Sequence, residues 1–314
     1  MFNKRYIGLS LFLFFTGLLI ETPAFSQTPS ESVRKYFEMC SKGQSTTAYQ
    51  TQLLHENVEK IINETSRFTT DSLAKIRFAA YSLIGFLAQK TEDSKLKQNV
   101  VKKLIVGSKD KDGGVAGNCL QLLTQFKEVD FDVEAKYNLS EMALKPRTHY
   151  ETVIKICGWL NQKDLCFNFR KAIDEKQGDV YQRWAMRLAM ARMGDVEMIN
   201  YCLARLQKIG VNDDIVSGFF PDMVYTRQKA LFDPLLAVIE SDKDACSSSN
   251  PDSEVHIVCA FRVIELLAPY INGFPAKVDR SGSLISNNYD QTLKEVRTWI
   301  QQNRNTYTIV NDGF

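Results

Sequence analysis

The stretch DVYQRWAMRLAMARMGDVEMINYCLARLQKI, residues 179–209, indicates two helices joined by a very tight turn. Asp179 can accept hydrogen bonds from the unpaired N–H groups at the start of the first helix, as an N-cap residue does. Gly194 can take the left-handed conformation that ends a helix, and Asp195 can cap the second helix. Each helix has an apolar side at helical spacing, made by Val180, Trp184, Leu188 and Ala191 in the first and by Met198, Ile199, Cys202, Leu203 and Leu206 in the second. Neither helix can bury that side alone, so the pair needs neighbours of the same kind.

Comparable pairs follow one another over most of the chain. We expect their first helices to begin near Asp71, Asp112, Arg147, Asp179, Asp213 and Asp252. We expect the return helices at 95–107, 133–144, 164–173, 196–209, 230–240 and 289–303. Helix pairs that recur about every 30–45 residues are the signature of an α-solenoid. Because no strand pattern precedes the tail, the sequence predicts an all-α protein, a curved right-handed superhelix of roughly six stacked antiparallel helix pairs.

The first-helix strings resemble HEAT repeats, particularly the short HEAT-like class also seen in phycobilin lyases. In that pattern a capping Asp precedes a Val-Arg pair, small residues, an Ala-Leu pair and a Gly-Asp turn. The matching positions are Asp71, Ile76, Arg77, Ala80 and Leu83 in one unit, Arg183, Ala189, Met190, Gly194 and Asp195 in another, and Asn250, Pro251, Asp252, Val255, His256 and Cys259 in a third. The resemblance covers about residues 70–303. It implies stacked helices that serve as a binding surface or scaffold, and a likeness of repeat type transfers no lyase activity.

The N-terminus has a pattern of its own. Lys4 and Arg5 precede an apolar run over 7–20, and Ala24-Phe25-Ser26 places small residues where signal peptidase cleaves. This is the three-part pattern of a secretory signal peptide, and the run is short for a membrane-spanning helix. We expect an exported protein, periplasmic or extracellular, with no membrane span in the mature chain. The expected organisation is a signal peptide (1–26), N-terminal capping helices near 33–39 and 51–63 (27–69), a repeat array (70–303) and a C-terminal tail (304–314).

Composition and motifs exclude several functions. A net charge of +2 is too small to indicate nucleic acid or an anionic membrane as the partner. The chain has no GxSxG, HExxH, P-loop or dinucleotide-binding motif. His55, His149 and His256 show no metal-ligand spacing with any cysteine. We therefore expect no cofactor and no metal site, and we assign no catalytic residue.

Arginines and tryptophans of the helices have two interpretations each. Arg77 and Arg183 could contact a ligand, but hydrogen bonds to the Asp or carbonyls of a neighbouring pair explain them better, because charged groups often bind helix ends. Three tryptophans on helical stripes could line a carbohydrate groove, although core packing is the better explanation. They are Trp159, Trp184 and Trp299.

The longest irregular stretch of the expected array is 272–288, NGFPAKVDRSGSLISNN. Long loops in repeat proteins often gather on one binding face. The partner-binding residues of such a loop would be Phe274, Lys277, Asp279 and Arg280. The alternative is a loop that covers the last layer of the core.

Seven cysteines remain after removal of the signal peptide, so at least one is unpaired in a monomer. Most lie on apolar helix stripes, where a free cysteine behaves as a small hydrophobic residue, as we expect for Cys119, Cys157 and Cys202. Export would provide the oxidising compartment that a disulfide needs. Two pairs are candidates: Cys246 with Cys259, across a polar loop, and Cys157 with Cys166, across the turn of one helix pair.

Two classes of function are consistent with this sequence. The first is an exported, non-catalytic scaffold that binds a protein partner through its concave face or the 272–288 loop. The second is a helical-repeat enzyme or carbohydrate-binding protein that acts on cell-envelope polymers. An inward group of carboxylates with exposed aromatic rings would favour the second class. The absence of a catalytic motif favours the first.

Overall fold

The computed structural model describes residues 30–242, 245–247 and 256–314, and these residues are mostly helical. The longer helices are α1 (Glu31–Ser41), α2 (Thr47–Leu53), α3 (Val58–Thr65), α4 (Ala74–Ala88), α5 (Ser94–Gly107), α6 (Gly113–Leu123), α7 (Val133–Ala143), α8 (Tyr150–Trp159), α9 (Cys166–Asp174), α10 (Val180–Arg192), α11 (Val196–Lys208), α12 (Phe220–Thr226), α13 (Lys229–Ile239), α14 (Cys259–Leu267) and α15 (Tyr289–Asn303). Shorter helical segments are η1 (Ser66–Thr70), η2 (Glu128–Asp130), η3 (Lys163–Leu165), η4 (Ile215–Phe219) and η5 (Ala268–Tyr270). The predicted all-α class is confirmed.

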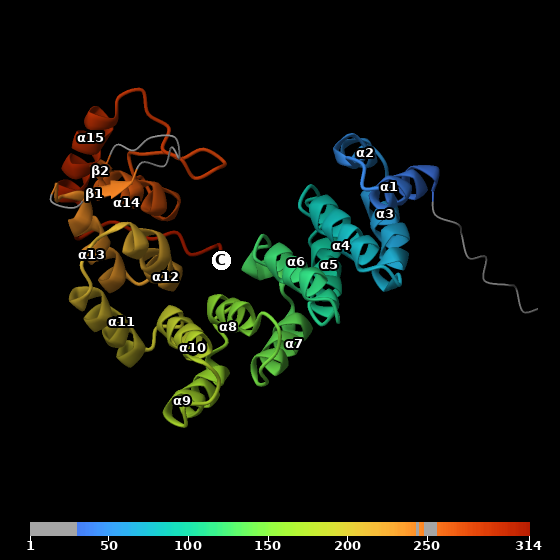
Figure 1. Cartoon of the computed structure of the whole chain (residues 1–314), viewed down its shortest axis with the longest axis horizontal. Helices are drawn as coiled ribbons and strands as arrows, with labels where there is room; N and C mark the ends of the chain where they lie inside the picture. The colour runs from blue at the N-terminus through green and yellow to red at the C-terminus, as the bar shows by residue number, and fades with distance from the viewer. Residues whose placement is uncertain (1–29, 243–244, 248–255) are drawn as a thin grey trace, which may run out of the picture.

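The helices follow one another along an arc (Figure 1), from α1–α3 at one end to α14 and α15 at the other. In the middle of the arc α8, α10 and α12 lie on the inner side, whereas α7, α9 and α11 lie on the outer side. Successive inner helices pack on one another, α8 on α10 and α10 on α12. The chain after α15 runs back to the inner side of the arc and ends near α8.

Aspartate side chains cap many of these helices, because a carboxylate accepts the N–H groups that the first turn leaves unpaired. The side chains of Asp93, Asp112, Asp132, Asp179 and Asp195 accept such bonds at the starts of α5, α6, α7, α10 and α11. At α10 the cap is reciprocal, since Gln182 accepts a hydrogen bond from the Asp179 N–H.

Two expected aspartate caps are wrong. Asp71 does not cap α4, which begins at Ala74; its side chain accepts from the Leu73 N–H at 2.8 Å and so fixes the turn before the helix. Asp213 precedes η4, where the side chain of Asn212 accepts from the Ile215 N–H instead. Asp213 binds the N–H and hydroxyl of Ser247, at 2.8 and 2.6 Å, and thereby holds β1 against this turn.

The boundaries of several expected helices also change. The single helix expected at 51–63 is two helices, α2 and α3, because Asn57 caps a new helix after a break in the chain. The helix expected from Asp252 begins only at Cys259. Strand β2 (His256–Val258) precedes it and pairs antiparallel with β1 (Ala245–Ser247), so the prediction that no strand occurs before the tail is also wrong. Asp252 itself lies outside the described residues.

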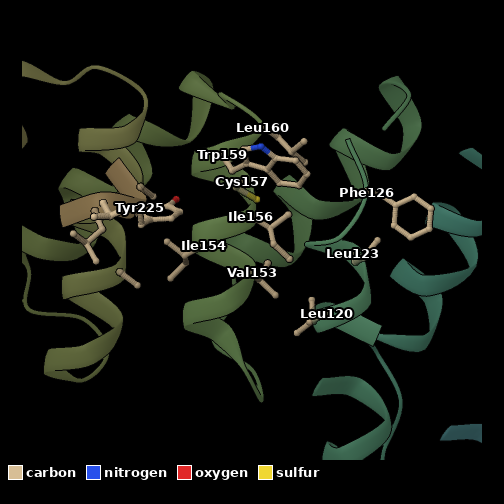
Figure 2. Close-up of a cluster of buried hydrophobic side chains, with 14 of the residues drawn as sticks. Leu120, Leu123, Phe126, Val153, Ile154, Ile156, Cys157, Trp159, Leu160 and Tyr225 are labelled. Carbon is tan, nitrogen blue, oxygen red and sulfur yellow. The ribbon is translucent and has the colours of Figure 1, made fainter. Parts of the chain in front are cut away.

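The buried core continues from one helix to the next along the arc. Figure 2 shows its centre, where side chains of α8 lie between those of α6 and Tyr225 of α12. Gly158 of α8 allows this packing: a Cβ there would lie 2.7 Å from the Ala189 Cα and 2.5 Å from the Tyr225 hydroxyl. A glycine is therefore required where α8, α10 and α12 meet.

The predicted signal peptide and the predicted C-terminal tail lie at opposite ends of the chain. The predicted signal peptide, residues 1–26, lies outside the described residues. Among the described residues, no helix has both the length and the apolar character that a membrane crossing requires. The predicted tail is an ordered extended segment that passes over other helices, as described below.

Candidate binding site

Of the four loop residues predicted to contact a partner, Phe274 is buried and the other three are exposed. Phe274 is buried and its ring packs edge-to-face on Trp299, with ring centroids 5.3 Å apart. Asp279 organises the turn by accepting hydrogen bonds from Ser281 and from the Ser283 N–H, and these bonds, chiefly that of the Ser281 side chain, lower its pKa. Only Lys277 and Arg280 are exposed without such a role.

The repeat arginines lie where neighbouring helix pairs meet. The Arg77 guanidinium is buried and donates two 2.7 Å hydrogen bonds to Asp110, in the loop before α6, and one of 2.9 Å to the Asp71 carbonyl. Arg183 donates to the carbonyls of Lys176 and Gly178, which follow α9. Gly194, at φ +88°, makes the turn between α10 and α11. These contacts fit the structural interpretation of both arginines.

Of the two candidate cysteine pairs, one forms a disulfide. Cys246 and Cys259 form a disulfide between β1 and the first residue of α14, with Cα atoms 4.9 Å apart. Cys157 and Cys166 are free thiols, and Cys119 and Cys202 are free and buried. Cys259 can reach the strand because it starts α14, rather than lying two turns inside it as the sequence suggested.

The most distinctive surface of the arc is one that the sequence analysis did not single out. It consists of Lys155 and Trp159 of α8, Arg192 at the end of α10, and Asp222, Tyr225 and Arg227 of α12 and the residue after it, and we call it the inner-face cluster. Residues 310–314 lie against it. The ring of Phe314 packs edge-to-face on Trp159, with ring centroids 5.9 Å apart. It also packs at a tilt on Tyr225, with ring centroids 5.6 Å apart.

Two arginines of the inner-face cluster hold the main chain of the tail. Arg192 donates to the Gly313 carbonyl at 2.7 Å and also to the Tyr225 carbonyl. Arg227 donates to the carbonyls of Val310 and Phe314, each at 3.1 Å. Three carbonyls of a five-residue segment are thus bound by two guanidinium groups, whose several N–H donors suit this arrangement.

The guanidinium groups of Arg192 and Arg227 are partly or largely shielded from water. Arg227 is only 7% exposed and its guanidinium lies 3.8 Å from the centroid of the Tyr270 ring. Within the described part of the chain, neither Arg192 nor Arg227 forms an ion pair with an Asp or Glu side chain. Burial, together with repulsion from Arg227, lowers the pKa of Arg192 to about 10, and burial also lowers the pKa of Arg227.

Other members of the inner-face cluster are linked by an ion pair and hydrogen bonds. Lys155 forms a 2.7 Å ion pair with Asp222, whose other carboxylate oxygen accepts from the Trp184 indole N–H at 2.6 Å. The Tyr225 hydroxyl donates to the Lys155 carbonyl at 2.6 Å, and burial raises the pKa of this phenol. The Tyr225 ring, which contacts Phe314, is therefore held against α8.

Two pockets lie beside residues 310–314. One has a volume of about 380 Å³ and is lined by Trp159, Lys163, Arg192, Arg227 and Asn311, among others. The other, of about 240 Å³, is lined by Lys155, Tyr225, Arg227, Tyr270 and Phe314, among others. Arg227 borders both. The tail thus occupies the middle of a larger cationic and aromatic surface.

The inner-face cluster offers guanidinium donors and aromatic rings. Its one carboxylate, Asp222, is already bonded through both oxygens. In the portion of the chain that the structure describes, no three His, Cys, Asp or Glu side chains gather as metal ligands. Guanidinium groups aimed at carbonyls, next to an aromatic niche, suit the recognition of an extended peptide.

Sequence reasoning missed this cluster because its members come from three separate segments and a fourth, residues 310–314, lies against them. One local signal was available: Arg192 and Arg227 each lie at the end of an inner helix, in corresponding places of two successive pairs. A second signal was Phe314, an aromatic residue that follows the polar residues Asn311 and Asp312. Comparison of the chain with known proteins found no matching family model, no similar curated protein and no similar solved structure.

Proposed function

We propose that this protein is an exported, non-catalytic scaffold, a HEAT-like α-solenoid that binds a segment of a protein partner on the inner face of its arc. The observation that carries the proposal is that the inner-face cluster already binds an extended chain segment, residues 310–314, through main-chain carbonyls and one aromatic ring. A surface suited to a segment of its own chain is suited to similar segments of other chains.

The repeat assignment supports the proposal from a second direction. Aspartate-capped helices in succession, an arginine that ties one pair to the next through Asp110, and a glycine turn at Gly194 agree with the HEAT-like pattern of the sequence. Arrays of this kind usually present an extended concave surface to a partner. Export rests on the N-terminal signal pattern.

Site-specific photo-cross-linking in the native cells tests this function. A benzophenone amino acid replaces Lys163, which is exposed beside the larger inner pocket, or Tyr137, which is 63% exposed on the outer helix α7. We expect a discrete cross-linked protein at position 163, in at least five-fold excess over position 137. Equal cross-linking at both positions, or cross-linking only at 137, would contradict binding on the inner face.

A further inference from the structure

The tail is recognised mainly through features that any peptide has. Arg192 and Arg227 contact carbonyl oxygens of residues 310, 313 and 314, and a carbonyl occurs at every residue. A Cβ added at Gly313 would meet no other atom within 4 Å, so this position accepts other residues. The inner-face cluster therefore does not require the exact sequence of this tail.

Two side chains of the tail do contribute specificity. Phe314 occupies the niche between Trp159 and Tyr225, where an aromatic ring gains partial burial, an edge-to-face contact with Trp159 and a tilted contact with Tyr225. Asp312 is exposed, and its charge acts favourably on Arg227. Because neither the buried Arg227 nor the half-buried Arg192 has an Asp or Glu ion-pair partner among the described residues, an acidic group on a ligand adds a favourable charge interaction.

The tail also has the geometry of a replaceable ligand. Its first part is tied to the end of the arc, since the Asn272 N–H donates to the Thr308 carbonyl at 3.0 Å and the Val310 N–H donates to the Tyr270 carbonyl at 2.9 Å. Beyond residue 310, Gly313 and Phe314 contact the inner-face cluster. Residues 311–314 can thus leave the surface while the β-bridge at 309 keeps them nearby.

We propose that the inner-face cluster binds an extended peptide of a protein partner in which an acidic residue lies two positions before an aromatic residue, and that residues 310–314 fill this site as an internal ligand until such a peptide displaces them. This inference rests on the proposed function and specifies the kind of segment that the partner offers. A ligand on the same chain competes with an external peptide at an effective concentration in about the millimolar range. The external peptide should therefore bind more tightly when the tail loses the contacts that hold it in the site.

Fluorescence polarisation with a labelled peptide tests the inference. The probe is TIVNDGF, the sequence of residues 308–314. Its C-terminus is amidated so that the Asp carboxylate is its only negatively charged group. The receptors are the full-length protein and its full-length Phe314→Ala variant. We expect the probe to bind the variant at least ten-fold more tightly than the wild type, because the variant's own tail has lost its aromatic anchor.

Control peptides test each element of the recognition. Replacing the Phe of the probe by Ala should weaken binding at least ten-fold, replacing its Asp by Asn should weaken it about three-fold, and replacing its Gly by Ala should leave it unchanged. A second receptor, Val310→Pro, lacks the N–H that bonds to the Tyr270 carbonyl, and it should show the same gain as Phe314→Ala. It replaces the first receptor if circular dichroism shows that Phe314→Ala is unfolded.

Several results overturn the inference. These are equal affinity of wild type and folded variants for the probe, absence of binding to either folded variant, and equal binding of the Phe→Ala peptide. Cross-linking at residue 163 reports separately on the proposed function. If a partner is cross-linked at residue 163 but the folded variants do not bind the probe, the scaffold function is supported and the proposed class of peptide is wrong.

Discussion

Single arginine residues perform two different tasks in this molecule. Arg77 is buried opposite a carboxylate, Asp110, and joins two successive parts of the arc. Arg227 is also buried and Arg192 is half-buried, but they donate to main-chain oxygens and form no ion pair with an Asp or Glu side chain among the described residues. An arginine without a carboxylate side chain as its partner can attract a ligand that carries negative charge.

The Arg77–Asp110 pair gives a prediction about acid stability. Hydrogen bonds from Arg77 hold the pKa of Asp110 below its ordinary value of 3.8. The unfolded chain therefore takes up this proton more readily than the folded one. The stabilisation is complete above about pH 4 and is lost as the pH falls through the lowered pKa of the folded state.

Asp110→Asn should remove this pH dependence and leave the Arg77 charge buried without its partner. We expect a lower melting temperature at pH 7, with a loss clearly larger than that of Glu31→Gln, which breaks the exposed pair with Lys35. Thermal denaturation between pH 3 and 7 measures both effects. Equal losses for the two variants would show that the buried pair has no special weight.

Gly158 gives a prediction about close packing. Gly158→Ala places a methyl group 2.7 Å from the Ala189 Cα, a backbone atom that cannot move aside as a side chain can. We expect a loss of about 1–3 kcal/mol in the free energy of unfolding, measured by urea denaturation. The control is Gly313→Ala, where the added methyl group meets no atom. If Gly158→Ala is as stable as that control, α8 and α10 do not approach as closely as described.

Among the elements, the turn between α10 and α11 depends on one conformation. Gly194 has φ +88°, which residues with a side chain rarely adopt. Gly194→Val should cost about 1 kcal/mol or more, and Gly194→Asn should cost less because Asn tolerates the left-handed region. Equilibrium unfolding compares the two. An unchanged midpoint for the Val variant would place the turn elsewhere.

The disulfide fixes the only paired strands of the described chain to α14. Replacing both Cys246 and Cys259 by Ser should cost about 3 kcal/mol in the chain-entropy account of a loop of this length. Cys166→Ser, at a free and half-buried thiol, is the matched control. A reducing agent should lower the melting temperature of the wild type but not that of the double variant. Two separately alkylatable thiols in the non-reduced protein would contradict the bond.

The sequence predicted elements better than it predicted the site, for a physical reason. Helical periodicity and caps such as Asp179 and Asp195 are local, so they can be recognised in one stretch of chain. The start of α14 was misplaced because the short β-pairing before it depends on a partner strand. The inner-face cluster joins α8, α10 and α12 and is contacted by residues 310–314, and the sequence does not reveal that these separate segments meet.

At the scale of the whole molecule, the arc and its tail act together. The helices provide an inner side, and the chain returns from α15 to cover part of it (Figure 1). Because the tail is held by Arg192, Arg227 and an aromatic niche, the free protein has its cationic surface partly covered. A partner segment that takes the place of the tail gains contacts that are already organised.

Hydrogen–deuterium exchange of the wild type and of Phe314→Ala tests most directly whether residues 310–314 lie on the inner face. We predict faster exchange in Phe314→Ala at the Val310 amide and around Arg192 and Tyr225, with no change in α4 and α5. Addition of the TIVNDGF peptide should restore protection around Arg192 and Tyr225. Identical exchange in the two proteins, or a change spread evenly over the whole arc, would show that the inner-face cluster is not where the tail, or a partner peptide, binds.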